Sequence, residues 1–71
     1  MRNRLEECRL GRGWTQQELA DRAGVSRQTI ISLERGRYNP SILLAFRLAR
    51  IFTVRIEELF LYTEEDDDEG V

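Results

Sequence analysis

Residues 15–36 read TQQELADRAGVSRQTIISLERG, and this stretch contains two helix starts separated by a turn. Thr15 is a typical helix N-cap, and Glu18 follows three positions later, which is the spacing of a capping box. Gly24 is suited to end this first helix, because glycine adopts the left-handed backbone of a tight turn without strain. The stretch therefore opens with a short helix that begins at Gln16.

A second short helix follows directly. Ser26 is its N-cap, and a glycine after the last residue stops it, which predicts a helix over residues 27–35. Ile30 and Leu33 lie on its inward face at helical spacing. Two short helices joined by a glycine-containing turn are the helix-turn-helix pattern, which here spans residues 16–35.

The outward face of this second helix carries no acidic residue. Its members are Arg27, Gln28, Ile31, Ser32 and Arg35, which form a single stripe at helical spacing. Arginine bonds both acceptors of guanine, and glutamine bonds the paired donor and acceptor of adenine. Ser32 suits either kind of base edge, and Ile31 suits a thymine methyl group. We therefore expect Arg27, Gln28, Ile31 and Ser32 to contact bases in the major groove of DNA, with phosphate contact as the alternative for Arg27.

Three further helices are expected outside this unit. Their ranges are residues 2–12, 42–52 and 56–60, and residues 61–63 are suited to a short strand. Cys8 lies at a core position of the first range, where we expect a buried and unreactive thiol. The predicted fold class is all-α, with five helices in one domain over residues 1–62.

The helix expected over residues 42–52 is apolar almost all the way round, with Arg47 and Arg50 as its only charged residues. Two apolar faces are more than the packing of a 71-residue monomer needs. The surplus predicts a homodimer interface formed by this helix, the loop after it and the last helix. The residues expected there are Leu48, Phe52, Val54 and Leu59.

The charges divide sharply along the chain, although the net charge is only −2. Residues 1–56 hold eleven arginines against five acidic residues, a net of +6, and residues 57–71 hold eight acidic residues and no basic one. A basic body suits a partner with a phosphate backbone. The acidic run, residues 63–71, is expected to be a disordered tail.

Composition excludes several other classes of protein. One cysteine and no histidine provide neither a zinc site nor a disulfide, so we expect no metal, no cofactor and no enzyme activity. No apolar run approaches the roughly 20 residues of a membrane span, and the first residues lack an apolar leader segment. The expected location is the cytoplasm, with no membrane partner and no small-molecule ligand.

The chain resembles the Xre family, the phage Cro/repressor type of helix-turn-helix. The resemblance covers about residues 2–62 and is carried by Leu5-x-x-Cys8-Arg9, Trp14-Thr15-Gln16-x-Glu18-Leu19-Ala20, Gly24-Val25-Ser26-Arg27-Gln28-Thr29-Ile30 and Glu34-x-Gly36-x-Tyr38-Asn39-Pro40-Ser41. It implies a five-helix domain of the lambda-repressor type that binds a palindromic operator as a homodimer and acts as a transcriptional repressor. In some members the two chain ends add a short β-ribbon.

The resemblance also implies roles for individual residues. Gln16 matches the position at which the family clamps a phosphate, and Arg37, Asn39 and Ser41 surround a second phosphate-binding stretch. Turn formation and helix capping are the alternative for Asn39 and Ser41. Arg9 and Glu34 match a structural ion pair of the family. The sequence departs from the family at Thr53, where a helix-ending glycine is common.

A protein-interaction module is the alternative function. Domains of this type also serve as antitoxins or as coactivators that bridge two partners, and the helix over residues 42–52 and the acidic tail would then be the working surfaces. Salt-sensitive binding to DNA separates the two functions, because only the DNA-binding function requires it.

Overall fold

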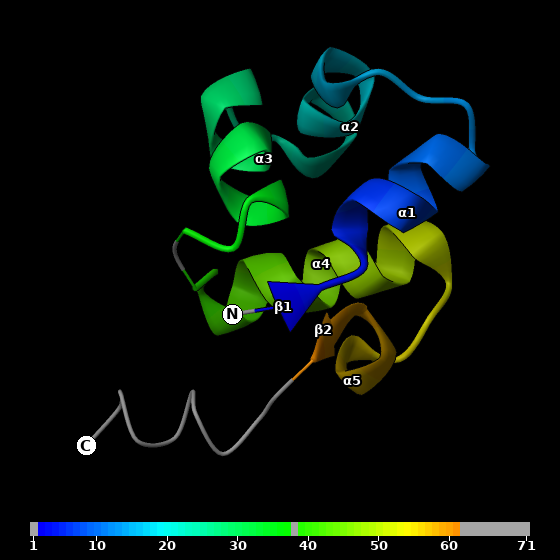
Figure 1. Ribbon diagram of the computed structural model, residues 1–71, viewed down its shortest axis with the longest axis vertical. Helices are drawn as coiled ribbons and strands as arrows, with labels where there is room; N and C mark the ends of the chain where they lie inside the picture. Colours follow the sequence, from blue (N-terminus) through cyan, green and yellow to red (C-terminus); the bar gives the residue numbers. More distant parts are fainter. Residues whose placement is uncertain (1, 38, 62–71) are drawn as a thin grey trace.

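The computed structural model describes residues 2–37 and 39–61, and the acidic tail expected over residues 63–71 lies outside these ranges. Within them the chain forms five helices and a two-stranded sheet (Figure 1). The elements in chain order are β1 (Arg2–Asn3), α1 (Leu5–Gly11), α2 (Gln16–Ala23), α3 (Arg27–Glu34), α4 (Ile42–Phe52), α5 (Ile56–Leu59) and β2 (Phe60–Leu61). The predicted five-helix architecture is confirmed, and no helix in the described ranges has the length and apolar character needed to cross a membrane.

The capping box predicted for α2 is present. The backbone N–H of Glu18 donates to Thr15 Oγ1 at 3.0 Å, and the backbone N–H of Thr15 donates to Glu18 Oε1 at 3.2 Å. Gly24 ends the helix with a φ of 71°, the left-handed conformation that the turn requires. Local sequence signals therefore determine both ends of α2.

α3 and α4 begin in the same way, with a serine N-cap. Ser26 Oγ accepts the backbone N–H of Thr29, and Ser41 Oγ accepts the backbone N–H of Leu44. α4 ends at Phe52, and the φ of 56° at its C-cap Thr53 makes Thr53 the one described residue other than glycine in the left-handed region. A β-branched side chain is strained there, so the departure from glycine has a structural cost.

The first predicted helix was wrong at its start. Arg2 and Asn3 form a strand that pairs antiparallel with Leu61 and Phe60, respectively. Asn3 Oδ1 accepts the backbone N–H of Leu5, and Asn3 Nδ2 donates to the carbonyl of Leu33 at 2.7 Å. These bonds hold the chain extended, so the helix begins only at Leu5.

The last helix is one residue shorter than predicted, because Phe60 belongs to β2. The ribbon implied by the family resemblance is therefore confirmed, and the strand expected over residues 61–63 starts one residue earlier. Tyr62 and Thr63 lie outside the described residues. The ribbon joins the two ends of the described chain, below α4 in Figure 1.

One core holds the helices together. Its buried apolar side chains are Leu5, Leu19, Ala20, Ala23, Ile30, Leu33, Ala45, Leu48, Ala49, Phe52, Leu59 and Phe60. Trp14 covers one edge of this core, with its ring centroid 5.5 Å from that of Phe52. Cys8 packs against the core at the expected position but is partly buried rather than fully buried, and burial raises the pKa of its thiol, which favours the neutral form.

The placement of this core corrects the expected dimer interface. Leu48 and Leu59 are 0% exposed and Phe52 is 5% exposed, so these side chains pack inside one subunit. These side chains therefore are not available for contact with a second copy of the chain. The sequence pattern of α4 correctly indicated two apolar faces, but Leu48 and Phe52 lie on the face that meets the core, and Leu59 is a buried residue of α5. Val54 alone of the four expected residues is partly exposed.

Candidate DNA-binding surface

α3 presents a short outward surface at one end of the molecule. In Figure 1, α2 and α3 lie together at the end opposite α5 and the ribbon. Arg27 and Gln28, in the first turn of α3, are exposed, whereas Ile31 and Ser32 in the next turn are half-buried. The stripe predicted from the sequence therefore has two long, accessible side chains at the start of the helix, two shorter and less accessible ones behind them, and the exposed Arg35 just after the helix.

The electrostatic character of this surface is basic. Arg27, Arg35 and Arg37 are all exposed, and none forms an ion pair with a carboxylate of the described residues. The only acidic residue of α3 is Glu34, whose side chain is 2% exposed and paired with Arg9. Arg27 on α3, and Arg35 and Arg37 directly after it, thus carry positive charge that no carboxylate of residues 2–37 or 39–61 neutralises at contact distance.

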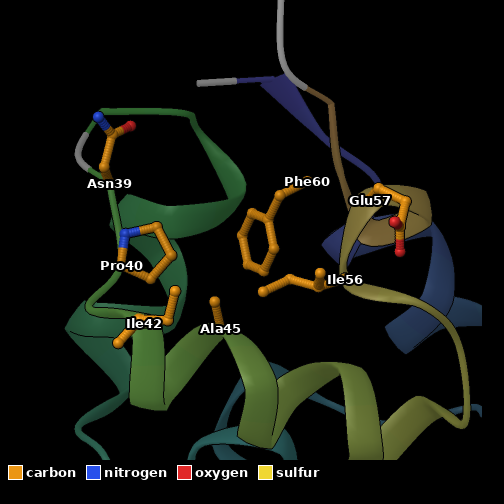
Figure 2. A pocket seen from close by; sticks show the side chains of 7 residues that line it. All are labelled: Asn39, Pro40, Ile42, Ala45, Ile56, Glu57 and Phe60. Carbon is orange, nitrogen blue, oxygen red and sulfur yellow. The ribbon is translucent and has the colours of Figure 1, made fainter. Parts of the chain in front are cut away.

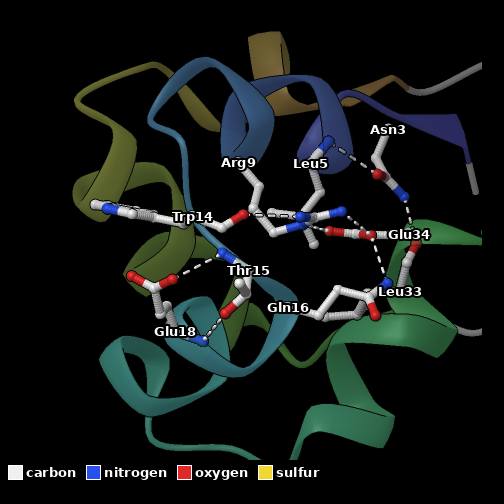
Figure 3. Close-up of polar contacts among 9 residues, drawn as sticks. All are labelled: Asn3, Leu5, Arg9, Trp14, Thr15, Gln16, Glu18, Leu33 and Glu34. Atoms are coloured by element: carbon white, nitrogen blue, oxygen red, sulfur yellow. Dashed lines mark hydrogen bonds and ion pairs between the residues drawn. The ribbon is translucent and has the colours of Figure 1, made fainter.

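The Arg9–Glu34 pair implied by the resemblance forms inside the molecule (Figure 3). Arg9 Nε and Nη2 donate to the two carboxylate oxygens of Glu34 at 2.6 and 3.2 Å, and Arg9 Nη1 donates to the carbonyl of Trp14 at 2.8 Å. The hydrogen bond to Glu34 raises the pKa of the Arg9 guanidinium. One buried cation therefore connects α1, the loop before α2 and the end of α3.

Gln16 joins this network from the start of α2. Its Nε2 donates to Glu34 Oε1 at 3.1 Å, which the sequence did not reveal (Figure 3). The backbone N–H of Gln16 belongs to the first helical position, where an α-helix offers donors and a positive potential to an anion. The structure thus places the residue expected to contact phosphate at an anion-attracting helix end.

The loop between α3 and α4 holds the other residues expected to contact phosphate. Arg37, Asn39 and Ser41 are exposed, and Tyr38 lies outside the described residues. The backbone N–H of Arg37 donates to the carbonyl of Ser32 at 3.0 Å, which ties the loop to α3. Ser41 Oγ already accepts a capping bond, but its O–H remains a potential donor to phosphate, so capping and phosphate contact are compatible.

α4 has a second apolar face outside the core. Ile42, Leu43 and Phe46 are 69%, 74% and 54% exposed. Two shallow apolar grooves of about 400 and 390 Å³ lie beside them. The first groove, shown in Figure 2, is lined by Asn39, Pro40, Ile42, Ala45, Ile56, Glu57 and Phe60. The second is lined by Phe46, Ala49, Arg50, Val54, Arg55, Ile56 and Glu57.

Comparisons with known proteins agree with this architecture. The helix-turn-helix family pattern matches residues 5–59. This chain is similar to an uncharacterized HTH-type transcriptional regulator of Archaeoglobus fulgidus, with 52% identity over 66 residues that cover 93% of this chain and 94% of that protein. It is also similar to the competence pilus inhibition repressor of Acinetobacter baylyi, with 43% identity over 60 residues, 82% of this chain and 53% of that protein. The crystal structure of the restriction-modification controller protein C.AhdI from Aeromonas hydrophila has a TM-score of 0.72 and 35% identity, covering 80% of this chain and 86% of that one.

Proposed function

This chain belongs to the helix-turn-helix family of transcriptional regulators, and we propose that it represses transcription by binding a palindromic DNA operator as a homodimer. The observation that carries the proposal is the exposed pair Arg27 and Gln28 in the first turn of α3. The Acinetobacter relative, which is named as a repressor, supports this direction of regulation.

The proposed contacts follow from the docking geometry of a helix-turn-helix. α3 enters the major groove with its N-terminal residues nearest the bases. Arg27 bonds guanine and Gln28 bonds adenine, while Ile31, one turn further along α3, contacts a thymine methyl group and Ser32 contacts a base edge. Phosphate oxygens on one side of the groove bind at Gln16, and those on the other side bind at Arg37, Asn39 and Ser41. Phosphate contacts set the position of α3 but carry no direct sequence information.

The homodimer is proposed to form through the exposed face of α4. A two-fold axis places the same surface of both copies in contact, so each copy must offer both projections and hollows. Leu43 and Phe46 are the projections, and the two grooves beside α4 are the hollows. Val54, which lines the second groove, stays in the proposed interface. A two-fold dimer requires half-sites with centres about 34 Å apart, or roughly 10 base pairs.

Selection of bound duplexes from random DNA, followed by substitution of Arg27, tests this function. We expect a palindromic half-site pair and binding that weakens steeply with salt. Arg27→Ala is expected to cost roughly 1–3 kcal/mol and to relax the preference at one base pair of each half-site. Gln17→Ala, an exposed change on α2 outside the proposed contacts, is the control.

Two outcomes contradict the proposal. Uniform loss of affinity in Arg27→Ala, with the base preference unchanged, shows that α3 does not read the operator. Absence of salt-sensitive DNA binding in the unmodified protein favours the protein-interaction function instead. Operator binding also implies the compartment that holds the genome, so we propose a cytoplasmic location.

A further inference from the structure

We infer that Glu34 is a positioning residue that orients the side chain of Gln16 for its phosphate contact, an inference that rests on the proposed function. Glu34 is the last residue of α3 and its side chain is 2% exposed, so its carboxylate has no direct access to DNA. Its carboxylate instead accepts Nε2 of Gln16 across 18 positions of sequence (Figure 3). Glu34, which does not contact DNA, thereby determines the orientation of the Gln16 side chain at the start of α2.

The chemistry of the two side chains determines how the amide points. An ionised carboxylate only accepts hydrogen bonds, whereas a glutamine amide donates through its nitrogen and accepts through its oxygen. The orientation of Gln16 with nitrogen toward Glu34 is therefore favoured, and the flipped amide would place two acceptors against each other. One N–H of Gln16 is used on Glu34. The second N–H diverges from it in the amide plane and is available to a phosphate oxygen, together with the backbone N–H of the same residue.

Arg9 neutralises the Glu34 carboxylate, which lies close to the proposed phosphate contact at Gln16. An isolated buried carboxylate would repel the DNA backbone and would itself be costly to bury. Arg9 donates to both oxygens of Glu34, so the pair carries no net charge toward the DNA. Its third nitrogen, Nη1, donates to the carbonyl of Trp14, two residues before Gln16, so the same guanidinium also fixes the chain that leads into α2.

A double-mutant cycle separates positioning from a purely structural role. The proteins are the unmodified chain, Gln16→Ala, Glu34→Gln and the double variant, and the probe is a fluorescein-labelled duplex of mixed sequence at fixed low salt. A glutamine at position 34 accepts as well as donates, so it no longer selects one orientation of Gln16. Gln17→Ala, whose side chain bonds to exposed Asp21, is the matched control and is expected to leave binding unchanged.

We expect Gln16→Ala to weaken binding roughly tenfold, and Glu34→Gln to weaken it roughly three- to tenfold. In the Gln16→Ala background, Glu34→Gln is expected to change the affinity less than about twofold, because the group it orients is gone. Equal effects of Glu34→Gln in both backgrounds overturn the inference, as does unchanged affinity of the single variant. An effect of Gln16→Ala indistinguishable from that of its control overturns the phosphate contact itself, and no DNA binding by the unmodified chain overturns the proposed function.

A measurement on the unmodified protein covers the case in which Glu34→Gln does not fold. The two side-chain amide protons of Gln16 give separate NMR signals because rotation about the amide C–N bond is slow, and only one of them faces Glu34. Addition of the duplex is expected to shift one signal strongly and the other little. Equal shifts of both protons, or none in either, contradict the inference.

Discussion

Two leucines on α4 provide a matched test of which face of that helix is core and which is interface. Leu48 is fully buried, whereas Leu43 is 74% exposed, and both stand on the same helix. The same truncation to alanine at each position therefore has opposite consequences. Leu48→Ala is expected to destabilise the subunit, and Leu43→Ala is expected to weaken only the proposed dimer.

The expected magnitudes differ by several-fold. Truncation of a fully buried leucine costs about 2–5 kcal/mol, through lost apolar burial and the cavity that remains. A 71-residue domain has a total stability of roughly 4–11 kcal/mol, so Leu48→Ala removes a large part of it. The unfolding midpoint is then expected to fall by roughly 8–40 °C. At Leu43, truncation changes the stability of the isolated subunit by no more than about 0.5 kcal/mol.

For the stability of the proposed dimer interface, Leu43→Ala is expected to have the larger effect of the two variants. Burial of Leu43 at a two-fold interface contributes about 2 kcal/mol for each copy. Its removal is therefore expected to raise the dimer dissociation constant by roughly a hundredfold or more. Thermal unfolding followed by circular dichroism, over on the order of a hundredfold range of protein concentration, reports both effects. Sedimentation equilibrium then measures the dissociation constants directly.

Measurements on the two variants and on the unmodified protein can refute the assignment of the core face and the interface face of α4. If Leu43→Ala lowers the low-concentration midpoint as much as Leu48→Ala does, the assignment of the two faces of α4 is wrong. If the midpoint of the unmodified protein does not rise with concentration and sedimentation shows only monomer, the exposed face of α4 is not a dimer interface. Leu48→Ala with an unchanged midpoint contradicts the core itself.

Two further changes test the acidic end and the strained helix terminus. Removal of residues 64–71 is expected to tighten binding to random duplex DNA about fivefold at low salt and less at high salt. The reason is that the carboxylates of this segment compete with phosphates for the basic body. Unchanged affinity would leave residues 64–71 only a solubilising role. Thr53→Gly is expected to stabilise the protein by about 0.5–1 kcal/mol, since relief of the left-handed strain exceeds the added chain entropy of glycine. Thr53→Ala keeps Cβ and is the control in urea titrations, and an equal gain in both variants contradicts the strain at Thr53.

The parts of the fold that the sequence predicted are those set by local signals. The capping box of Thr15 and Glu18, the serine caps of α3 and α4 and the turn at Gly24 each act within a few residues, so the sequence alone located them. The start of α1 was missed because it depends on a distant partner. Asn3 bonds the carbonyl of Leu33, 30 positions away, and no local pattern reports such a contact.

In the candidate site, too, some features follow from local sequence patterns and others depend on distant parts of the chain. The outward position of Arg27 and Gln28 follows from helical spacing and was predicted from it. The burial of Leu48 was not predictable, because α4 is apolar on both faces and the periodicity gives no reason to prefer one. Which face meets the core depends on where α2 and α5 pack, and that information is distributed over the whole chain.

The long-range polar bonds explain how so small a core holds α3 in a defined orientation. Apolar packing by Ile30 and Leu33 resists separation of α3 from the core, but it resists rotation and sliding of the helix less well, since such contacts are not directional. Hydrogen bonds are directional, and two sets of them act on the C-terminal end of α3: Asn3 holds the carbonyl of Leu33, and Arg9 holds the carboxylate of Glu34. The capping bond of Ser26 orders the other end. A helix whose C-terminal end is tied to β1 and α1 presents Arg27 and Gln28 at a fixed rotation, which a base-specific contact needs. β1 and α1 therefore contribute to the proposed recognition although none of their residues belongs to the reading surface.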